Sequence, residues 1–336
     1  MTEKWIFITG GCGYIGSHLA AVLKEKTDYK VLLIDKRAAD LKHTIRYSDL
    51  FADEEFDSSL IQKCLYDQHP VAVVHLAAVP TITAGIIDPI EQWKVNVSQT
   101  INLIETCMSA NIENFIFAST SAIYADSDDA VTENSPLNPI NSYASTKLAI
   151  EHLLRDCWIS HEFPSISLRF FNAAGAHNQY DLGELHGSTH LLSSVMNAAV
   201  NNGAFNIFGR DWPTPDGTAI RDYTHVLDIA DAIIASIEWS KTNKGCHTFN
   251  VGKGFGNSVQ EMVNTTERIL NKELLYRYGP RREGDSAKRF ANIDKIVKEI
   301  GWTPKRTLDD IVRDEFKWYN SVTYRNLLDA SIYSIY

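Results

Sequence analysis

The 336-residue sequence has little cysteine and no long apolar run. Its cysteines stand far apart and never form a Cys-x-x-Cys pair: Cys12, Cys64, Cys107, Cys157 and Cys246. This pattern argues against a disulfide framework or a structural zinc site and is typical of the reducing cytoplasm. No run approaches 18 apolar residues, and the first residues lack a charged region followed by an apolar stretch. We therefore expect a cytoplasmic protein without a signal peptide, a membrane span or a bound metal.

Clustered positive charge is also missing. The chain has 32 Lys and Arg residues against 42 Asp and Glu residues, a net charge of −10, and its basic residues stand singly. Because nucleic-acid binding needs a basic patch, no nucleic-acid partner is expected. A composition of 44% hydrophobic and 22% charged residues is ordinary for a globular enzyme with a large core. Any anionic ligand must be held by local groups against the overall charge.

Short β-branched segments alternate with helical patterns along the chain. The segments are "WIFIT", "KVLLID", "VAVVHLAA", "NFIFAST", "SISLRFF" and later "HTFNVG". They are apolar on both faces, as buried parallel strands are. The helical patterns between them cover residues 15–26, 58–68, 90–110 and 144–159. This alternation predicts an α/β fold, a Rossmann-type doubly wound parallel sheet with right-handed crossovers.

The regular alternation of strand and helix patterns ends at about residue 172, and Gly, Asn, His and turn residues become frequent there. A helix over 226–239 and the strand "HTFNVG" return to the sheet, a capping box Ser258-x-x-Glu261 opens a later helix, and a last helix lies near 307–320. The expected parts are a sheet domain, a smaller C-terminal lobe and a tail without an assigned role. The sheet domain is expected to cover 1–171 plus about 222–252, and the smaller lobe about 172–221 plus 253–320. The tail covers 321–336.

Four glycines crowd into "TGGCGYIGSH", residues 9–18, directly after the first strand and before the first helix. Gly10 can take a positive φ where the strand turns, Gly13 lets the backbone approach a pyrophosphate, and Gly16 lets helix and strand pack closely. The N-terminus of the helix offers unpaired N–H groups to phosphate. The spacing predicts a dinucleotide site, with a purely structural turn as the alternative.

The second strand, "KVLLID", ends in Asp35, 19 positions beyond Gly16. A carboxylate there receives the ribose hydroxyls and repels a 2′-phosphate, which favours NAD over NADP. Lys36 and Arg37 follow at once and weaken that preference, because a nearby arginine accommodates the 2′-phosphate. Asp49 and Leu50, at the end of the next expected strand, are candidates to hold the adenine, with a polar loop end as the alternative.

Tyr143 and Lys147 stand four apart in "NSYASTKLAIEHLL", hence one turn apart on one helix face. A tyrosine ionises near pH ~10, but an ammonium one turn away and an oxidised nicotinamide would lower its pKa and supply phenolate. The strand "FIFASTSAIY" carries Ser119, Thr120 and Ser121 at its end, where open parallel sheets face their ligands. The alternatives are a solvated helix lysine and a β-favouring threonine.

The glycine motif, the strand-end hydroxyl and Tyr-x-x-x-Lys together resemble the extended short-chain dehydrogenase/reductase superfamily. The segments "LRFFNAAGAH", "FGRDWPTPDGTAIRDYTHVLDIADA", "NVGKGFGNSV" and "PRREGD" resemble the UDP-glucose 4-epimerases, over residues 5 to about 318. The resemblance implies reversible epimerisation at C4 of a UDP-hexose through a transient 4-keto intermediate, with NAD kept bound and no net oxidation. It makes Tyr143 the base, Lys147 its activator and a nicotinamide-ribose ligand, and Thr120 the partner of the sugar O4.

The resemblance also implies two binding sets. NAD would be lined by Gly10, Gly13, Tyr14, Ile15, Gly16, Asp35, Asp49, Leu50, Leu76, Ala77, Ala78, Asn96 and Phe170. UDP would be held by Asn172, His190, Leu191, Phe208, Arg221, Arg282 and Asp285. Forked arginine donors suit a diphosphate, and Asp285 can accept the ribose hydroxyls. Without the resemblance, surface salt bridges are the simpler interpretation of the two arginines.

By the same resemblance, the sheet domain binds NAD, the lobe binds the UDP-sugar, and the chain forms a homodimer. The dimer would be a four-helix bundle built from the helices near 90–110 and 144–159 of each subunit. Their apolar residues suit this bundle and suit packing on the sheet equally: Ile101, Leu103, Ile104, Leu148, Ile150, Leu153 and Leu154.

Three departures from the family pattern bear on the site. "HLAAVPTITAG" lacks a lysine that commonly touches cofactor phosphate, and the spacing to Asn96 is one residue longer, so NAD is held more weakly or differently. Lys36 follows Asp35 where asparagine is frequent. Arg289 stands where a residue limits room for the sugar C2 substituent; there it either favours UDP-galactose and UDP-glucose over N-acetyl forms, meets a uronate carboxylate, or turns to solvent.

Four other functions stay open at this point. Two are 4-epimerases of UDP-N-acetylhexosamines or of UDP-uronates. A nucleotide-sugar 4,6-dehydratase needs an acid pair directly after the strand-end threonine, where this chain has Ser121 and Ala122. A NAD-sensing regulator on the same fold has no need of the Tyr, Lys and hydroxyl set that the chain retains.

Overall fold

A computed structural model describes residues 3–35, 44–46, 58–80, 82–184, 191–282 and 285–332. In 44–46, 58–60, 82–83 and 328–332 it describes the backbone only. Asp49, Leu50 and His190, which the sequence predicts as binding residues, lie outside the described residues, as do Lys36 and Arg37.

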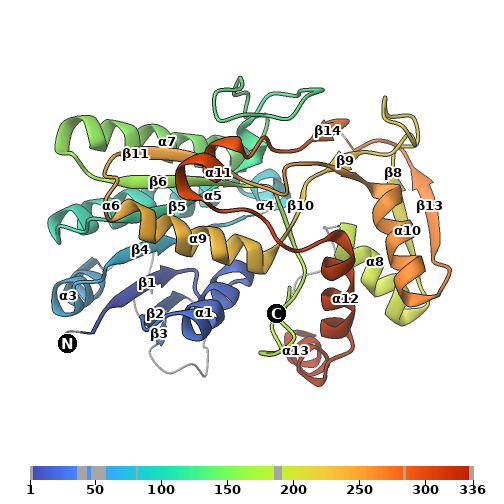
Figure 1. The fold of residues 1–336 in the computed structure, drawn as a ribbon, viewed down its shortest axis with the longest axis horizontal. Coiled ribbons are helices and arrows are strands. Elements are labelled where there is room, and N and C mark those ends of the chain that lie inside the picture. Colours follow the sequence, from blue (N-terminus) through green and yellow to red (C-terminus); the bar gives the residue numbers. More distant parts are fainter. Residues whose placement is uncertain are drawn as a thin grey trace.

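The centre of the molecule is a seven-stranded sheet in the order β11-β6-β5-β4-β1-β2-β3, parallel at every pairing (Figure 1). The predicted α/β fold with a doubly wound parallel sheet is therefore confirmed. The strands are β1 (Trp5–Thr9), β2 (Lys30–Asp35), β3 (Thr44–Arg46), β4 (Ala72–His75), β5 (Phe115–Thr120), β6 (Ser165–Phe170) and β11 (Cys246–Val251).

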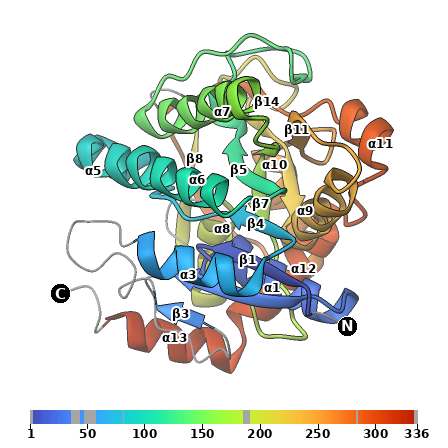
Figure 2. The ribbon, with the colours of Figure 1, turned by 90° about the vertical axis from the view of Figure 1, so that its left-hand side faces the viewer.

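Helices cover both faces of the sheet (Figure 2). Ile6 and Ile8 of β1 belong to a core with α1 (Tyr14–Lys26), α9 (Val226–Ser240) and α11 (Asp294–Ile300). Trp5 and Phe7 point to the opposite face and its core, which includes α3 (Ser58–Gln68), α6 (Gln99–Ser109) and α7 (Ser142–His161). Because alternate side chains enter different cores, every residue of "WIFIT" is buried.

The predicted helix over 90–110 is three pieces. Asp88 caps α5 (Pro89–Trp93) through the Glu91 amide, a π-helical turn covers Lys94–Ser98, and α6 follows. A π turn is the form that one inserted residue takes inside a helix, and it coincides with the longer spacing to Asn96. Among the apolar residues weighed for a dimer, four are buried in the core beside the sheet: Leu103, Ile104, Ile150 and Leu154.

The remaining elements form smaller sheets and helices beside the carboxyl ends of the main strands. The paired strands are β7 (Asn172–Ala174) with β10 (Tyr223–His225), β8 (Ala204–Phe208) with β13 (Leu275–Gly279), and β9 (Ile220–Arg221) between β12 (Asn257–Ser258) and β14 (Lys288–Arg289). The helices are α4 (Ile82–Ile87), α8 (Leu191–Asn201), α10 (Val259–Leu270), α12 (Leu308–Tyr319) and α13 (Val322–Ile332).

The capping box Ser258–Glu261 at the start of α10 is confirmed, and the last predicted helix is α12. The division into two domains stays a prediction. One segment assigned by sequence to the smaller lobe, α11, packs through Ile296 in the core of the large sheet. The tail, which received no role, forms α13, where the buried Tyr324 packs against Trp318 and Tyr319.

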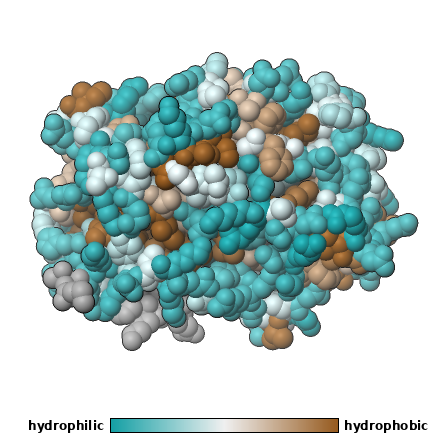
Figure 3. Space-filling view, viewed as in Figure 1, coloured by the Kyte–Doolittle hydropathy of each residue, from teal (hydrophilic) through white to brown (hydrophobic). Residues whose placement is uncertain are grey.

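On the face viewed in Figure 3, hydrophilic residues predominate and hydrophobic residues gather in small separate groups. Within the described part of the chain, no helix combines the length and apolar character that crossing a membrane requires.

Candidate active site

The glycine-rich turn after β1 is packed too tightly for side chains. Gly10 has a φ of +69°, the positive value expected there, and a Cβ on it would lie 2.7 Å from the Ala77 amide nitrogen. A Cβ on Gly16 would lie 2.4 Å from the Gly10 carbonyl oxygen. The turn thus brings α1 and the segment after β4 together and leaves bare backbone at the end of β1.

The groups around this turn fit a dinucleotide. Gly13 is the N-cap residue of α1 and supplies no side-chain cap, so the first N–H groups of the helix are open to phosphate oxygens. Asp35 ends β2, is 5% exposed, and accepts a hydrogen bond from the Cys12 amide at 2.9 Å. Its carboxylate is held beside the glycine turn, where ribose hydroxyls are bound in this kind of fold.

The Asn96 side chain forms hydrogen bonds with other parts of the protein. From the π turn, its Oδ1 accepts from the Val79 amide at 2.7 Å, and its Nδ2 donates to the Val79 carbonyl and to Thr146 Oγ1. Leu76, Ala77 and Ala78 lie between β4 and Val79. Asn96 therefore ties the segment after β4, predicted to line NAD, to the helix that carries Tyr143.

Thr120, Tyr143 and Lys147 meet at the carboxyl end of β5. Asn141 starts α7 by accepting from the Ala144 amide, which places Tyr143 in the first turn. The phenol contacts the Thr120 hydroxyl, and Lys147 Nζ lies 5.9 Å from the centre of the Tyr143 ring and 4.8 Å from that of Phe117. The structure thus brings the three predicted catalytic residues together.

The protein's own groups raise the phenol pKa. Burial raises the pKa of Tyr143 to about 12, and within the described part of the chain only the contact with Thr120 lowers it. Burial also lowers the pKa of Lys147 to about 7, because its ammonium lies over Phe117 with little access to water. The lowered phenol pKa expected from the sequence therefore requires a positive charge in addition to the Lys147 ammonium.

Behind this site lies a buried cluster that the sequence reasoning missed. Ser119 donates to Glu151, whose carboxylate is paired with Arg169 of β6. Two signals were present. Glu151 extends the Tyr143–Lys147 spacing by another four residues on the same face of α7, and Arg169 interrupts the otherwise uncharged strand "SISLRF".

The predicted UDP residues form two groups. Arg221 Nη2 lies 3.9 Å from Asp285 Oδ1, and Arg221 is in register with Arg289 across β9 and β14. Arg282 stacks on Phe208 with its guanidinium 3.9 Å from the ring centre. Other predicted binding residues stand at the ends of elements: Tyr14 and Ile15 at the start of α1, Phe170 at the end of β6, Asn172 at the start of β7 and Leu191 at the start of α8.

Arg289 is held inside the site. Its Nη1 donates to the Ser121 carbonyl at 3.2 Å, and its Nη2 pairs with Asp126 Oδ1 at 2.9 Å. The side chain is 15% exposed, so it does not turn to solvent as one of the sequence alternatives had it. The guanidinium lies next to the residue that follows Thr120.

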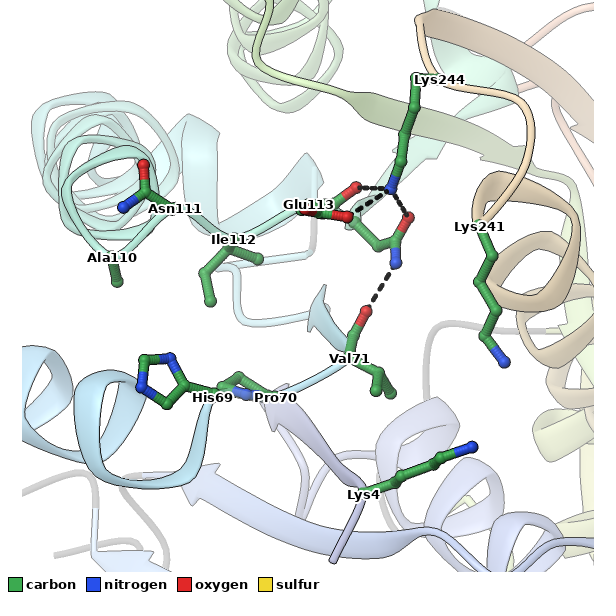
Figure 4. A pocket seen from close by; sticks show the side chains of 11 residues that line it. Lys4, His69, Pro70, Val71, Ala110, Asn111, Ile112, Glu113, Lys241 and Lys244 are labelled. Atoms are coloured by element: carbon green, nitrogen blue, oxygen red, sulfur yellow. Dashed lines mark hydrogen bonds and ion pairs between the residues drawn. The ribbon is translucent and has the colours of Figure 1, made fainter. Parts of the chain in front are cut away.

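An open hollow of about 400 Å³ lies at the other end of the sheet (Figure 4). Its walls come from the amino ends of β1, β4 and β5 and from the turn after α9, including Lys4, Val71, Asn114 and Lys244. No residue predicted for the active site lines it. Because open parallel sheets bind ligands at the carboxyl ends of their strands, this hollow is not the active site. Throughout the described ranges, no cluster of three or more His, Cys, Asp or Glu could hold a metal.

The chain resembles characterised proteins over nearly its whole length. Residues 6–252 match the NAD dependent epimerase/dehydratase family. A UDP-glucose 4-epimerase of Azospirillum brasilense is 33% identical over 322 residues, which are 94% of this chain and 92% of the relative. A crystal structure of UDP-glucose-4-epimerase from Stenotrophomonas maltophila, with bound NAD and formylated UDP-arabinopyranose, is 28% identical with a TM-score of 0.87, covering 98% of this chain and all of that one. The UDP-glucose 4-epimerase of Bifidobacterium longum, in complex with NAD+ and UDP, is 29% identical with a TM-score of 0.86, covering 96% and 99%.

Proposed function

The chain belongs to the NAD dependent epimerase/dehydratase family, and from this premise we propose that it interconverts UDP-galactose and UDP-glucose with Tyr143 as the base. It is an isomerase that uses NAD and acts at C4 of a UDP-hexose. One observation carries the proposal for the residues. Thr120, Tyr143 and Lys147 converge at the carboxyl end of β5, at the same edge of the parallel sheet at which the glycine turn follows β1.

NAD, when bound, accepts a hydride from the sugar carbon and returns one, so the reaction has no net oxidation. The chain holds this cofactor with the backbone at Gly10, Gly13 and Gly16 and with the carboxylate of Asp35. Asn96 fixes the adjoining segment after β4. Since that segment lacks a lysine, retention of NAD rests on the turn and on Asp35.

Tyr143 takes the proton of the sugar 4-hydroxyl and later returns it to the same oxygen, while Thr120 donates a hydrogen bond to that oxygen. Lowering a phenol pKa from about 12 to neutrality takes roughly 7 kcal/mol. One cation at ~4 Å supplies roughly 4 kcal/mol at an effective dielectric constant of 20. More than one positive charge is therefore needed. We assign these charges to Lys147, kept protonated, and to the oxidised nicotinamide.

Arg221 and Arg282 hold the diphosphate, and Asp285 holds the uridine ribose. These contacts anchor the substrate at a distance from C4 and leave the sugar free to turn between the two half-reactions. Strong uniform contacts with the sugar would hinder that rotation without favouring the transition state.

Arg289 supports a preference for UDP-galactose and UDP-glucose. Its guanidinium is fixed by Ser121 and Asp126 beside Thr120, and we expect it there to narrow the room for a C2 N-acetyl group. The Asp126 carboxylate already pairs with it, which disfavours a second carboxylate from a uronate.

We also propose a cytoplasmic homodimer formed through the α5, α6 and α7 side of the molecule, where these helices lie together (Figure 2). Leu103, Ile104, Ile150 and Leu154 face the sheet and are not free to form the interface. Exposed apolar side chains on α4 and α5 take that part: Ile86 at 77%, Ile87 at 79%, Ile90 at 69% and Trp93 at 41%.

The test is purified protein incubated with UDP-galactose without added NAD, with the products followed by NMR. UDP-glucose is expected, and Tyr143→Phe should abolish its formation while UDP binding persists. A 4-keto-6-deoxy product would identify a dehydratase, and absence of turnover with intact NAD binding would identify a regulator. Parallel reactions with UDP-N-acetylgalactosamine and UDP-glucuronate decide the role given to Arg289; turnover comparable to that of UDP-galactose contradicts it.

A further inference from the structure

A charged residue is buried on an inner strand of the central sheet. Arg169 lies on β6 between two strands and is 5% exposed. Its Nε donates to Glu151 Oε1 at 3.0 Å and its Nη2 donates to Oε2 at 2.7 Å, a bidentate ion pair with a carboxylate that is 8% exposed. Its Nη1 donates to the Tyr124 hydroxyl and to the Glu133 carbonyl. All three guanidinium nitrogens are therefore used.

Stability alone does not explain this pair. Removing two charges from water costs several kcal/mol each, and well-packed apolar residues in place of such a pair are often as stable or more so. The pair instead fixes the relative position of the two elements that carry it, because hydrogen bonds set both distance and direction. Apolar contacts are not directional.

The cluster joins the two elements that carry the catalytic groups. Glu151 lies on α7, one turn beyond Lys147 and two turns beyond Tyr143. Its Oε1 also accepts a hydrogen bond from Ser119 Oγ at 2.5 Å, and Ser119 directly precedes Thr120 at the end of β5. Through one carboxylate, the strand end is held at a set distance from the helix.

The far side of the cluster is fixed as well. The Tyr124 hydroxyl, which accepts from Arg169, donates to Asn250 Oδ1 at 2.7 Å. Asn250 Nδ2 donates to the Val131 carbonyl, and the backbone amide of Asn250 donates to Glu133 Oε1. Arg169 is thus anchored to β11 and to the segment after β5, so that it cannot follow Glu151 if α7 moves.

We propose that Ser119, Glu151 and Arg169 are positioning residues, which set the distance between the Thr120 hydroxyl and the Tyr143 phenol. This proposal rests on the proposed function, in which these two groups act on one sugar oxygen. None of the three residues touches the substrate in it.

The test uses Ser119→Ala, which removes one hydrogen bond and leaves the ion pair intact. The matched control is Ser167→Ala on β6, because Ser167 is equally buried at 2% exposure and no hydrogen bond of its hydroxyl is found in the described part of the chain. Both holoenzymes are compared with the parent for turnover of UDP-galactose, UDP affinity and thermal unfolding.

Ser119→Ala is expected to lower kcat about tenfold with KM, UDP affinity and Tm nearly unchanged, since a small displacement of reacting groups costs rate rather than binding. Contact with Thr120 lowers the pKa of Tyr143 in the substrate-free protein, so its loss also moves the low-pH limb of the kcat/KM profile, which reports the free enzyme, to higher pH. Ser167→Ala should change neither kcat nor the pH profile.

Unchanged kcat and pH profile in Ser119→Ala would overturn the proposal, as would an equal loss in Ser167→Ala. If the parent itself fails to turn over UDP-galactose, the proposed function fails separately. Crystal structures of the parent and Ser119→Ala then decide the positioning role: a separation between Thr120 Oγ1 and the Tyr143 hydroxyl that is the same in both contradicts it.

Discussion

Lys147 shows at the scale of one residue how burial serves the chemistry. It is 3% exposed, and burial lowers the pKa of its ammonium to about 7. Near neutral pH, its protonation state therefore responds to any anion or cation placed beside it. An amine with this pKa becomes more fully protonated as the neighbouring phenol ionises, which suits the activating role proposed for Lys147.

The same shift predicts a pH-dependent stability difference. The folded pKa is about 7 and that of the unfolded chain is ~10.4, so between these values the unfolded chain binds more protons and stability rises with pH. In NAD-free protein, Lys147→Met should be more stable than the parent below pH 7, by roughly 5 kcal/mol at most, and the gap should shrink as pH rises toward 10. Denaturant unfolding at several pH values measures this, and a gap independent of pH contradicts the assignment.

Gly16 makes a second prediction at this scale. A Cβ on it would meet backbone at 2.4 Å, so Gly16→Ala must displace α1 from the turn. NAD affinity should fall at least about tenfold, because the helix N-terminus moves away from the phosphates. Gly203→Ala is the matched control, since the nearest atom to its Cβ is 4.0 Å away. Isothermal titration calorimetry with NAD compares the two variants, and equal affinities would contradict a role of the glycine turn in binding phosphate.

Individual residues were predictable where chemistry needs a fixed spacing along the chain. Tyr143 and Lys147, four apart, do share a helix face, and Gly10 does take a positive φ. The cluster behind them was not predicted, because Ser119, Glu151 and Arg169 come from three elements. Only the pairing of β5 with β6 and the packing of α7 bring them together.

Among elements, the π turn at Lys94–Ser98 has the clearest consequence. Gln92 precedes it and Asn96 lies within it, yet both donate to the Val79 carbonyl, at 3.2 Å each. Residues four apart stay on one side of a helix, in an α-helix and across the wider π turn alike, so both side-chain amides reach the same carbonyl. The turn therefore allows two helical segments to hold the same stretch after β4.

Deletion of Lys94 should accordingly weaken both stability and NAD binding. Asn96 lies within the turn, so closing the turn moves Asn96 away from Val79 and Thr146 and leaves buried polar groups unpaired, at a cost of about 1–3 kcal/mol. Lys94→Ala, which keeps the register, is the control and should behave as the parent does. Thermal unfolding and NAD titration check this, and a deletion variant indistinguishable from Lys94→Ala would show that the turn is incidental.

Strands were predicted closely and the smaller elements were not, for a physical reason. "WIFIT", "KVLLID" and "SISLRFF" are continuous apolar runs because they are buried on both faces, and β1, β2 and β6 match them within one residue. By contrast, β9, β12 and β14 are two residues long and exist only through their mutual pairing. The tail helix α13 likewise depends on contacts with other elements, including those of the Tyr324 ring with Trp318 and Tyr319.

At the scale of the whole molecule, the unpaired apolar surface on α4 and α5 bears on assembly. Apolar packing on the sheet uses the inner faces of α6 and α7, so a dimer on this side must draw on other residues. Ile86, Ile87, Ile90 and Trp93 are exposed, come from adjoining helices, and lie next to α7, which α4 and α5 both contact. A net charge of −10 opposes association of two copies, so burial of these side chains must outweigh that repulsion.

Ile90→Asp should therefore convert a dimer into monomers, since it places two negative charges, one from each subunit, in the proposed interface. Burial of an unpaired carboxylate costs several kcal/mol, more than most interfaces can lose. Leu275→Asp is the matched control, because Leu275 is 65% exposed on β13, far from α5 in Figure 1. Sedimentation equilibrium distinguishes the outcomes: a monomeric parent, or an Ile90→Asp variant that sediments as the parent does, would exclude this surface as the interface. Because Thr120, Tyr143 and Lys147 all come from one chain, the monomer should retain the catalytic groups, and its turnover measured alongside tests whether the site is complete in a single subunit.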